Sequence, residues 1–237
     1  MKVKVLGCGS MVSINNSASY LIDNHILLDI PNGTCKTLQR ININPYDITH
    51  ILITHFHADH YFDIPFLLSS KHIKEKEDLF IYLDKDNQYK INDLTKLAFP
   101  NSLERIMNSI NFKYITKNNF KINNYEVKKV LVDHGNIKPA FGYIFKTKNN
   151  IIGFTGDSSY CESIEKMASK CTHLFCDCNF EMGNNKHMGI NDIEKLALQH
   201  PNCTFYCTHM LDKTKEQIKA TNIKNIVILN DLDEFKY

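Results

Sequence analysis

The stretch Thr54-His55-Phe56-His57-Ala58-Asp59-His60 closes an apolar segment, residues 48–54. It places three imidazoles and one carboxylate close together, and neutral imidazole nitrogen and carboxylate oxygen are common ligands of zinc and related metals. Because side chains at i and i+2 point the same way on extended backbone, His55 and His57 can bind one ion. Asp59 and His60 are placed to bind a second ion if the chain then turns into a helix. The alternative is a polar surface loop, and further ligand-type residues later in the chain argue against it.

The spacing H-x-H-x-D-H resembles the metallo-β-lactamase superfamily, and the later motifs follow that superfamily's order. A lone histidine, an aspartate after a strand and a final histidine come next, here His134, Asp157 and His209. Each later motif is weak alone, but together they are specific, and the resemblance runs from residue 3 to about residue 229.

Finer motifs resemble the ribonuclease Z branch and related phosphodiesterases. They are the segments 6–10, 16–21, 62–68 and 139–143, and a further histidine, His187, just ahead of a predicted helix. Simple lactamases and glyoxalase II would not need this last histidine.

The fold expected from the pattern contains two sheets, because strands and helices alternate in two successive halves. Periodicity alone allows an α/β or an α+β protein. The resemblance implies an α+β fold, the four-layered αβ/βα sandwich of metallo-β-lactamases, as a single metal-dependent hydrolase domain over residues 1–237.

The resemblance also implies a dinuclear metal centre. One ion would be bound by His55, His57 and His134, and the other by Asp59, His60 and His209, with Asp157 bridging ions roughly 3.5–4 Å apart. Zinc is the first expectation, with manganese and iron as alternatives, because the same ligands suit all three. A zinc ion lowers the pKa of bound water from about 15.7 to about 7, so metal-bound hydroxide would be the nucleophile.

Two further roles are expected near the metals. Asp59 would steer the proton of the nucleophile, and His187 would act as general acid or phosphate anchor. The alternative for His187 is a loop histidine that only caps the next helix. Asp29 would orient a metal-binding histidine without itself binding metal.

Composition excludes several classes of protein. Net charge is +2, too balanced for bulk electrostatics to indicate a nucleic-acid-binding protein. No segment is apolar enough for a membrane helix, and the N-terminus reads as a strand, so we expect a cytoplasmic protein without membrane association. The eight cysteines are expected to be mostly small buried side chains. A homodimer is possible, since dimers are common in the branch.

The expected function is hydrolysis of a small phosphodiester, a nucleotide or a short nucleic acid. Ribonuclease Z carries a Gly/Pro-rich arm for tRNA between the lone histidine and the bridging aspartate, but here residues 135–156 leave room for one hairpin only. We therefore expect no strong tRNA binding. The alternatives are a hydrolase of lactones, thioesters or β-lactams on the same fold, and a metal or redox protein without hydrolase activity.

Several local expectations can be compared with the structure. Helices are predicted over 61–72, over 93–109 with an interruption near Pro100, and over 191–198 with Asn191 as N-cap and Glu194 completing a capping box. A group of five lysines is expected to form a solvated face: Lys113, Lys117, Lys121, Lys128 and Lys129. The remaining histidines are expected to be structural or exposed: His25, His50, His72, His173 and His200.

Overall fold

Two sheets of seven strands each form the centre of the protein in the computed structural model, which describes residues 1–71 and 77–237. The first sheet has the order β14 (Glu234–Lys236), β1 (Lys2–Gly7), β2 (Ser19–Ile22), β3 (Ile26–Leu28), β4 (His50–Leu52), β5 (Asp78–Tyr82) and β6 (Asn111–Ile115). The second has the order β13 (Ile226–Ile228), β12 (Thr204–Thr208), β11 (His173–Asp177), β10 (Ile151–Phe154), β9 (Ile137–Lys146), β8 (Tyr125–His134) and β7 (Asn119–Ile122).

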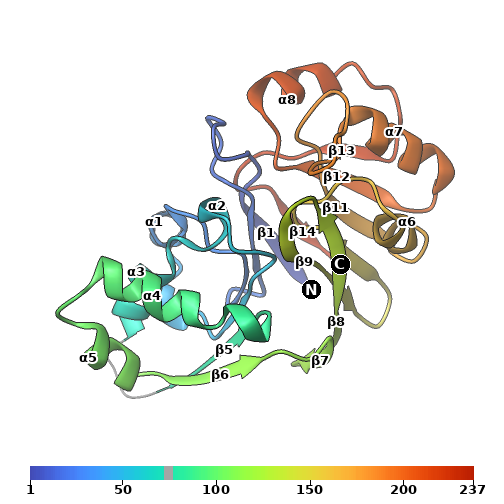
Figure 1. Ribbon diagram of the computed structural model, residues 1–237. Helices are drawn as coiled ribbons and strands as arrows, with labels where there is room; N and C mark the ends of the chain where they lie inside the picture. The colour runs from blue at the N-terminus through green and yellow to red at the C-terminus, as the bar shows by residue number, and fades with distance from the viewer. Residues whose placement is uncertain (72–76) are drawn as a thin grey trace.

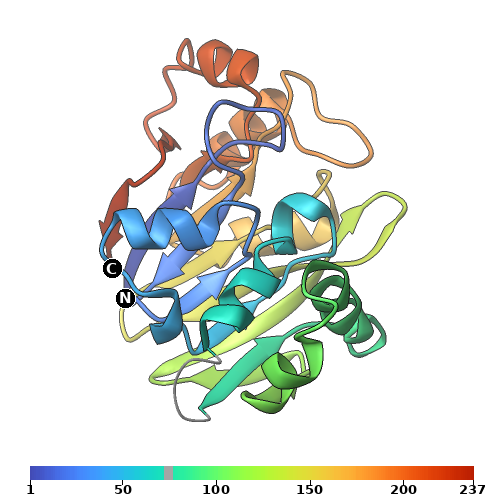
Figure 2. The same cartoon turned by 90° about the vertical axis from the view of Figure 1, so that its left-hand side faces the viewer.

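Helices cover the outer faces of the sheets. Figure 1 shows one group of helices on one side of the molecule, namely α1 (Thr34–Arg40), α2 (Ala58–Tyr61), α3 (Ile64–Lys71), α4 (Tyr89–Ala98) and α5 (Leu103–Asn108). The other side carries α6 (Glu162–Ala168), α7 (Ile190–Gln199) and α8 (Asp212–Ile218). In Figure 2 the first group faces the viewer, in front of its sheet. Short 3-10 turns at Pro45–Asp47 and Lys85–Asn87 complete the described elements.

Three apolar clusters account for the four layers. Phe145, Phe154 and Phe175 belong to the cluster between the two sheets. A second cluster joins the first sheet to the helices α1 to α5, and a third joins the second sheet to the remaining helices. The predicted α+β sandwich is confirmed. None of the described helices is long and apolar enough to cross a membrane.

The sandwich brings the ends of several strands to one edge. Strands β3, β4 and β5 run parallel in the first sheet, and β10, β11 and β12 run parallel in the second. Parallel strands end at the same edge of a sheet, and ligands bind beyond the carboxyl ends of such strands. The segments that follow β4, β10 and β12 carry six of the seven predicted ligands, and the seventh, His134, is the last residue of β8.

Some local predictions need correction. The helix predicted over 61–72 is α3, which begins only at Ile64 because the separate short helix α2 ends at Tyr61, and His72 lies outside the described residues. Helix α7 begins at Ile190, so Asn191 is not its N-cap; instead the backbone N–H of Gly189 donates to Asp192 Oδ2 at 3.0 Å. Asn191 lies two residues after the N-cap, Gly189, and its side chain accepts from the N–H of Gly183 at 2.8 Å instead of capping the helix.

Other local predictions agree with the structure. The interruption near Pro100 separates α4 from α5, although α4 already begins at Tyr89. Residues 135–156 contain β9, β10 and the turn that joins them, as the short spacing predicted. Seven of the eight cysteines are buried, and all eight are free thiols. Strand β14, which pairs with β1, was not predicted.

Candidate metal centre

The backbone bends sharply where it presents the site residues. Asp29, Gly156 and His209 have positive φ angles of 58°, 61° and 54°. A Cβ atom on Gly156 would lie 2.7 Å from the carbonyl oxygen of Phe141, so only glycine fits there. Left-handed backbone at Asp29 and His209 costs energy and is concentrated at functional sites in proteins.

The first group of potential ligands is formed by three histidines and a carboxylate: His55, His57, His134 and Asp157. His57 Nδ1 lies 3.0 Å from His55 Nε2 and 3.3 Å from His134 Nε2. His134 Nδ1 lies 2.8 Å from the carbonyl oxygen of Lys186, so this nitrogen carries the proton and Nε2 keeps its lone pair. Ring nitrogens that converge at such distances share either a ring proton or a cation.

Burial favours the uncharged form of these three rings. It lowers the pKa of His57 and His134, and it lowers the pKa of His55 well below its usual range. Neutral imidazole is the form that binds a metal. The group can therefore hold one ion.

The second group of potential ligands is Asp59, His60 and His209. His60 Nδ1 lies 2.7 Å from Asp29 Oδ2, so this nitrogen is the donor, and the buried His60 Nε2 has no hydrogen-bond partner. Asp29 also accepts from the N–H and the hydroxyl of Thr54, both at 2.8 Å. Asp29 thus orients His60 as predicted, and it connects this ring to the segment that follows β4.

Buried carboxylates surround the second group. Burial by itself would lower the pKa of His209, but the charge of Asp157 and hydrogen bonds to Asp177 and Asp59 outweigh it and raise this pKa to about 10. The pKa of His60 is raised in the same way, by Asp157 and Asp29, against the effect of burial. The raised pKa values of His60 and His209 show that the carboxylates around them stabilise positive charge. A metal ion would supply such a charge.

Asp157 lies between the two groups. Its Oδ2 is 3.3 Å from His60 Nε2 and from His209 Nε2, and 3.9 Å from His55 Nε2. Burial would raise its pKa, but the charges of His209 and His60 hold the pKa well below its usual range. An ionised carboxylate in this position can contact cations in both groups. The structure therefore brings together all seven predicted ligands.

His187 lies beside both groups without belonging to either predicted ligand set. Its Nδ1 is 2.8 Å from Asp177 Oδ2 and 4.0 Å from Asp157 Oδ2, and its ring stacks on His209 with centroids 5.2 Å apart. Burial would lower the pKa of His187, but the hydrogen bond and charge of Asp177 raise it. The side chain of His187 is 15% exposed and lines the cavity described below.

Sequence reasoning missed two residues of the site. Asp177 is buried at the end of β11, and besides holding His187 it accepts the N–H of Ser158 at 3.0 Å. The Asn179 amide nitrogen is 3.0 Å from His209 Nδ1, so its side chain helps to set that ring. The group Asp157, Asp177, His187 and His209 could itself hold an ion. The sequence signal that could have identified Asp177 was a carboxylate at the end of a parallel strand, because Asp157 likewise follows such a strand.

A cavity of about 540 Å³ opens over the two groups. Its walls include the apolar side chains of Met11, Val12, Phe180 and Leu211. Lys186 is the one lysine or arginine among the described residues that line it. The cavity thus combines apolar surface, potential metal ligands and one exposed lysine.

The other described histidines have structural surroundings. His50 stacks on Phe80 with centroids 4.8 Å apart, and burial lowers its pKa to about 4. His200 Nε2 is 2.7 Å from Glu165 Oε1, and His25 and His173 contact neighbouring loop and aromatic groups. These residues take no part in the site.

Comparison with known proteins agrees with this geometry. The family model of the anti-Pycsar protein Apyc1 matches residues 1–230. The chain belongs to this family. Over 126 residues it is also 33% identical to ribonuclease Z of Pyrococcus horikoshii, a match that covers 52% of this chain but only 39% of that protein.

Solved structures share the fold at low sequence identity. The metallo-β-lactamase fold protein YhfI from Bacillus subtilis superposes with a TM-score of 0.79 at 16% identity, covering 99% of this chain and 98% of YhfI. A diphosphatase of the PhnP family superposes with a TM-score of 0.77 at 18% identity, covering 100% and 97% of the two chains. The chain is a member of the metallo-β-lactamase superfamily, in its ribonuclease Z-like branch.

Proposed function

We propose that the protein is a dinuclear metal-dependent phosphodiesterase that acts on a small phosphodiester, a nucleotide or a short nucleic acid. The observation that carries this proposal is the arrangement of two ligand groups around Asp157 with His187 held beside them by Asp177. A hydrolase that needs only metal ligands has no use for a histidine fixed in this way. The likeness to ribonuclease Z and to a diphosphatase supports the same reaction class.

Two divalent ions fit the donor set. His55, His57 and His134 would hold one, Asp59, His60 and His209 the other, and Asp157 would contact both. Zinc is the first choice for neutral imidazole and carboxylate ligands, and manganese or iron are alternatives. When bound, such ions polarise a phosphate oxygen and make a water molecule nucleophilic at neutral pH.

The protein groups would orient the substrate and move protons. Burial would raise the pKa of Asp59, but the hydrogen bond to His209 and the charge of His60 lower it, so Asp59 stays ionised and can accept a proton. Since Nδ1 of His187 is bound to Asp177, Nε2 is the nitrogen left for the substrate. It would protonate the leaving oxygen or bind the phosphate group.

The cavity supports a small substrate. A volume of about 540 Å³ lies within the range of small-molecule sites. One lining lysine, Lys186, suits a single phosphate group better than a long polyanion. We accordingly propose weak binding of tRNA, and a homodimer remains a prediction for size-exclusion chromatography to check.

The test is to measure metal content and turnover together. Protein purified without chelator should contain two metal ions per chain by mass spectrometry and should hydrolyse bis-nitrophenyl phosphate. His55→Ala should lose metal and turnover together, whereas His25→Ala, a histidine outside the site, should change neither. Full metal occupancy in His55→Ala would contradict the ligand assignment. Turnover of a lactone or thioester without turnover of any phosphodiester would favour the other hydrolase, and bound metal without turnover a non-hydrolytic protein.

A further inference from the structure

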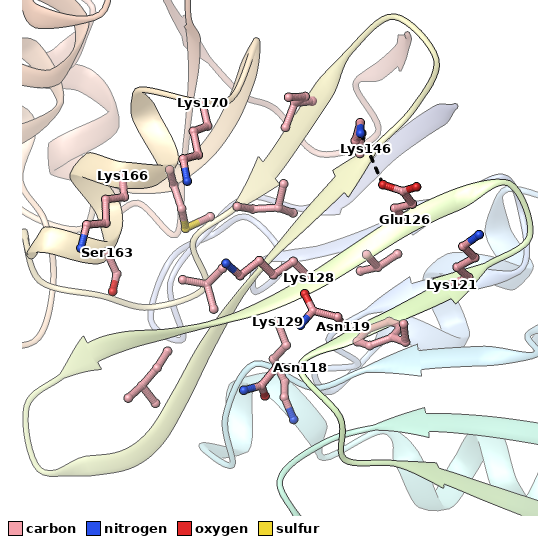
Figure 3. Close-up of a pocket in the computed structure, with 17 residues that line it drawn as sticks. Asn118, Asn119, Lys121, Glu126, Lys128, Lys129, Lys146, Ser163, Lys166 and Lys170 are labelled. Carbon is pink, nitrogen blue, oxygen red and sulfur yellow. Dashed lines mark hydrogen bonds and ion pairs between the residues drawn. The ribbon is translucent and has the colours of Figure 1, made fainter.

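A hollow larger than the cavity over the candidate metal centre lies away from that centre. It has a volume of about 860 Å³ and is bordered by β7, β8, β9, β10 and α6 (Figure 3). None of the predicted ligands lines it, and neither does His187. The proposed phosphodiesterase reaction therefore gives it no role.

The floor of this hollow is aliphatic. Val130, Ile144 and Ile151 lie on the outer face of the second sheet, only partly buried, and pack against the apolar cluster beneath α6 and α7. Met167 of α6 closes one side. The outer faces of the sheets in this fold are covered by helices, but next to α6 the described residues leave the face of β8 and β9 open.

The rim of the hollow is strongly basic. Five exposed lysines and one glutamate line it, Lys121, Lys128, Lys146, Lys166, Lys170 and Glu126. Together they carry a net charge of +4 in a chain of net charge +2, so the rest of the chain is net negative. The charge asymmetry makes this face attractive to an anionic partner.

Three of these lysines have no carboxylate partner among the described residues. Lys146 contacts Glu126 at 3.4 Å and Lys166 contacts Glu162 at 2.5 Å, both at the exposed surface. Lys121, Lys128 and Lys170 are exposed and make no ion pair with any described residue. Figure 3 shows Lys128 extending from β8 toward α6, across the hollow.

Lys129 differs from the others and corrects the prediction that all five clustered lysines form a solvated face. It points to the opposite side of β8 and is buried, where its Nζ donates to the carbonyl oxygens of Leu83 at 2.9 Å and Thr116 at 3.1 Å. Its ammonium also lies 4.5 Å from the centre of the Phe141 ring. Lys129 thus anchors the inner side of β8 by hydrogen bonds, and only the exposed lysines belong to the rim.

We propose that this hollow, the groove between α6 and the outer face of β8 and β9, docks an acidic amphipathic helix of a partner protein. A partner helix beside α6 would cover the open face of β8 and β9, as the chain's own helices cover the rest of the outer layer. Its apolar face would cover the aliphatic floor, and its acidic face would meet the unpaired lysines. Ser163, Lys166 and Met167 of α6 and Lys170 in the turn that follows it border the groove at i, i+3, i+4 and i+7 spacing, along one side of α6.

Two other occupants fit less well. A second copy of the chain related by a twofold axis through the groove would place lysines against lysines, which is repulsive. Single-stranded nucleic acid gains much of its affinity from stacking on aromatic rings. The groove offers only Phe120, whose ring is already stacked on Tyr82 with centroids 4.4 Å apart.

The experiment uses a labelled synthetic helix in place of the unidentified partner. The probe is an 18-residue peptide with leucine at i, i+3, i+4 and i+7 spacing and glutamate on the opposite face, and its matched control carries lysine in place of glutamate. Fluorescence anisotropy should show binding of the acidic peptide to the full chain at low salt, weaker binding at high salt, and no binding of the basic peptide. Lys128→Glu with Lys170→Glu should weaken binding about tenfold or more.

The control variant carries the same charge change elsewhere. Lys113→Glu with Lys224→Glu alters two exposed lysines outside the groove and should weaken binding less than about threefold, through long-range charge alone. Both double variants should keep the turnover of bis-nitrophenyl phosphate. A failure to bind the peptide can therefore be distinguished from a failure of the proposed phosphodiesterase reaction. Equal losses in the two variants, or no binding of the acidic peptide, would overturn the proposal. Tighter, groove-dependent binding of an 18-nucleotide oligothymidine would replace it by a nucleic-acid site.

Discussion

At the scale of single residues, His187 offers a test that separates the phosphodiesterase from other hydrolases. A general acid typically accelerates a reaction about 10²–10⁴-fold. His187→Ala should therefore lower kcat by this order while both metal ions stay bound, since His187 is outside the seven ligands. The loss should be smaller for a diester with a nitrophenolate leaving group than for one with a poor alkoxide leaving group, because nitrophenolate needs little protonation.

The controls for His187 decide between its two roles. His200→Ala, which removes a histidine paired with Glu165, should leave kcat unchanged. Equal losses on both diesters would indicate that His187 binds phosphate without protonating the leaving group. Unchanged rates on both would show that it is only a histidine ahead of a helix.

Asp29 allows a second prediction at this scale. Its carboxylate accepts from His60 and Thr54, and partners of this kind typically change metal affinity 10–100-fold. Asp29→Asn should weaken binding of the ion held by His60 by about this factor, so that the metal content at limiting free zinc falls from two ions toward one. Asp47→Asn, an exposed aspartate, should keep both ions. Loss of both ions, or of neither, would contradict the assignment of Asp29 to one of the two groups.

The residues themselves differ in how visible they are in the sequence. The segment 54–60 carries its ligands within one loop, and the later ligands each sit in a motif, so the resemblance could name all seven. Asp177 sits in no such motif. Its position becomes meaningful only when β11 is seen between β10 and β12, next to Asp157 and His209. The aliphatic and basic groove is likewise formed by residues from several elements.

At the scale of elements, Tyr143 connects the two sheets. It lies on β9, and its buried hydroxyl donates to the carbonyl oxygen of Ile53 at 2.7 Å and lies 3.3 Å from that of Tyr82. Tyr143→Phe would leave two buried carbonyl groups without this donor, which should lower the free energy of unfolding by about 1–3 kcal/mol in urea titrations. Tyr114→Phe, a half-buried tyrosine with no hydroxyl partner among the described residues, should cost less than about 0.5 kcal/mol. Similar values for both would mean that the bond between sheets contributes little.

The elements were predicted better than their ends and their pairing. Apolar periodicity located nearly all strands, because each has a side that packs into one of the three clusters. It could not show that the helix predicted from residue 61 begins only after Asp63, whose Oδ2 accepts the N–H of Cys35 from another part of the chain. The same holds for Asn191, where a distant N–H competes for the side chain. Contacts between segments remote in sequence decide these details.

At the scale of the whole molecule, the candidate site joins the two halves of the sandwich. His55, Asp59 and His60 come from the segment after β4 in the first sheet, and His134, Asp157 and His209 come from strand ends of the second. Ions held by both sets would link the two sheets, and a ligand that binds only the folded chain stabilises it by about 2.7 kcal/mol at a concentration 100 times its Kd. The sequence could suggest this arrangement only through the resemblance, because periodicity contains no information on how two sheets face each other.

Metal removal should therefore lower the stability of the whole chain as well as abolish turnover. Without ions, the converging nitrogens of His55, His57 and His134 have only a ring proton to share, and the carboxylates of the second group depend on protonated His60 and His209. Dialysis against a chelator should lower Tm by several degrees, and added zinc should restore both Tm and turnover. The matched control is the double variant His55→Ala with His209→Ala, whose Tm should respond to neither chelator nor zinc because each group has lost a ligand. If that variant and the unaltered protein lost the same number of degrees, the chelator would be acting elsewhere, and the site would not link the two sheets through metal.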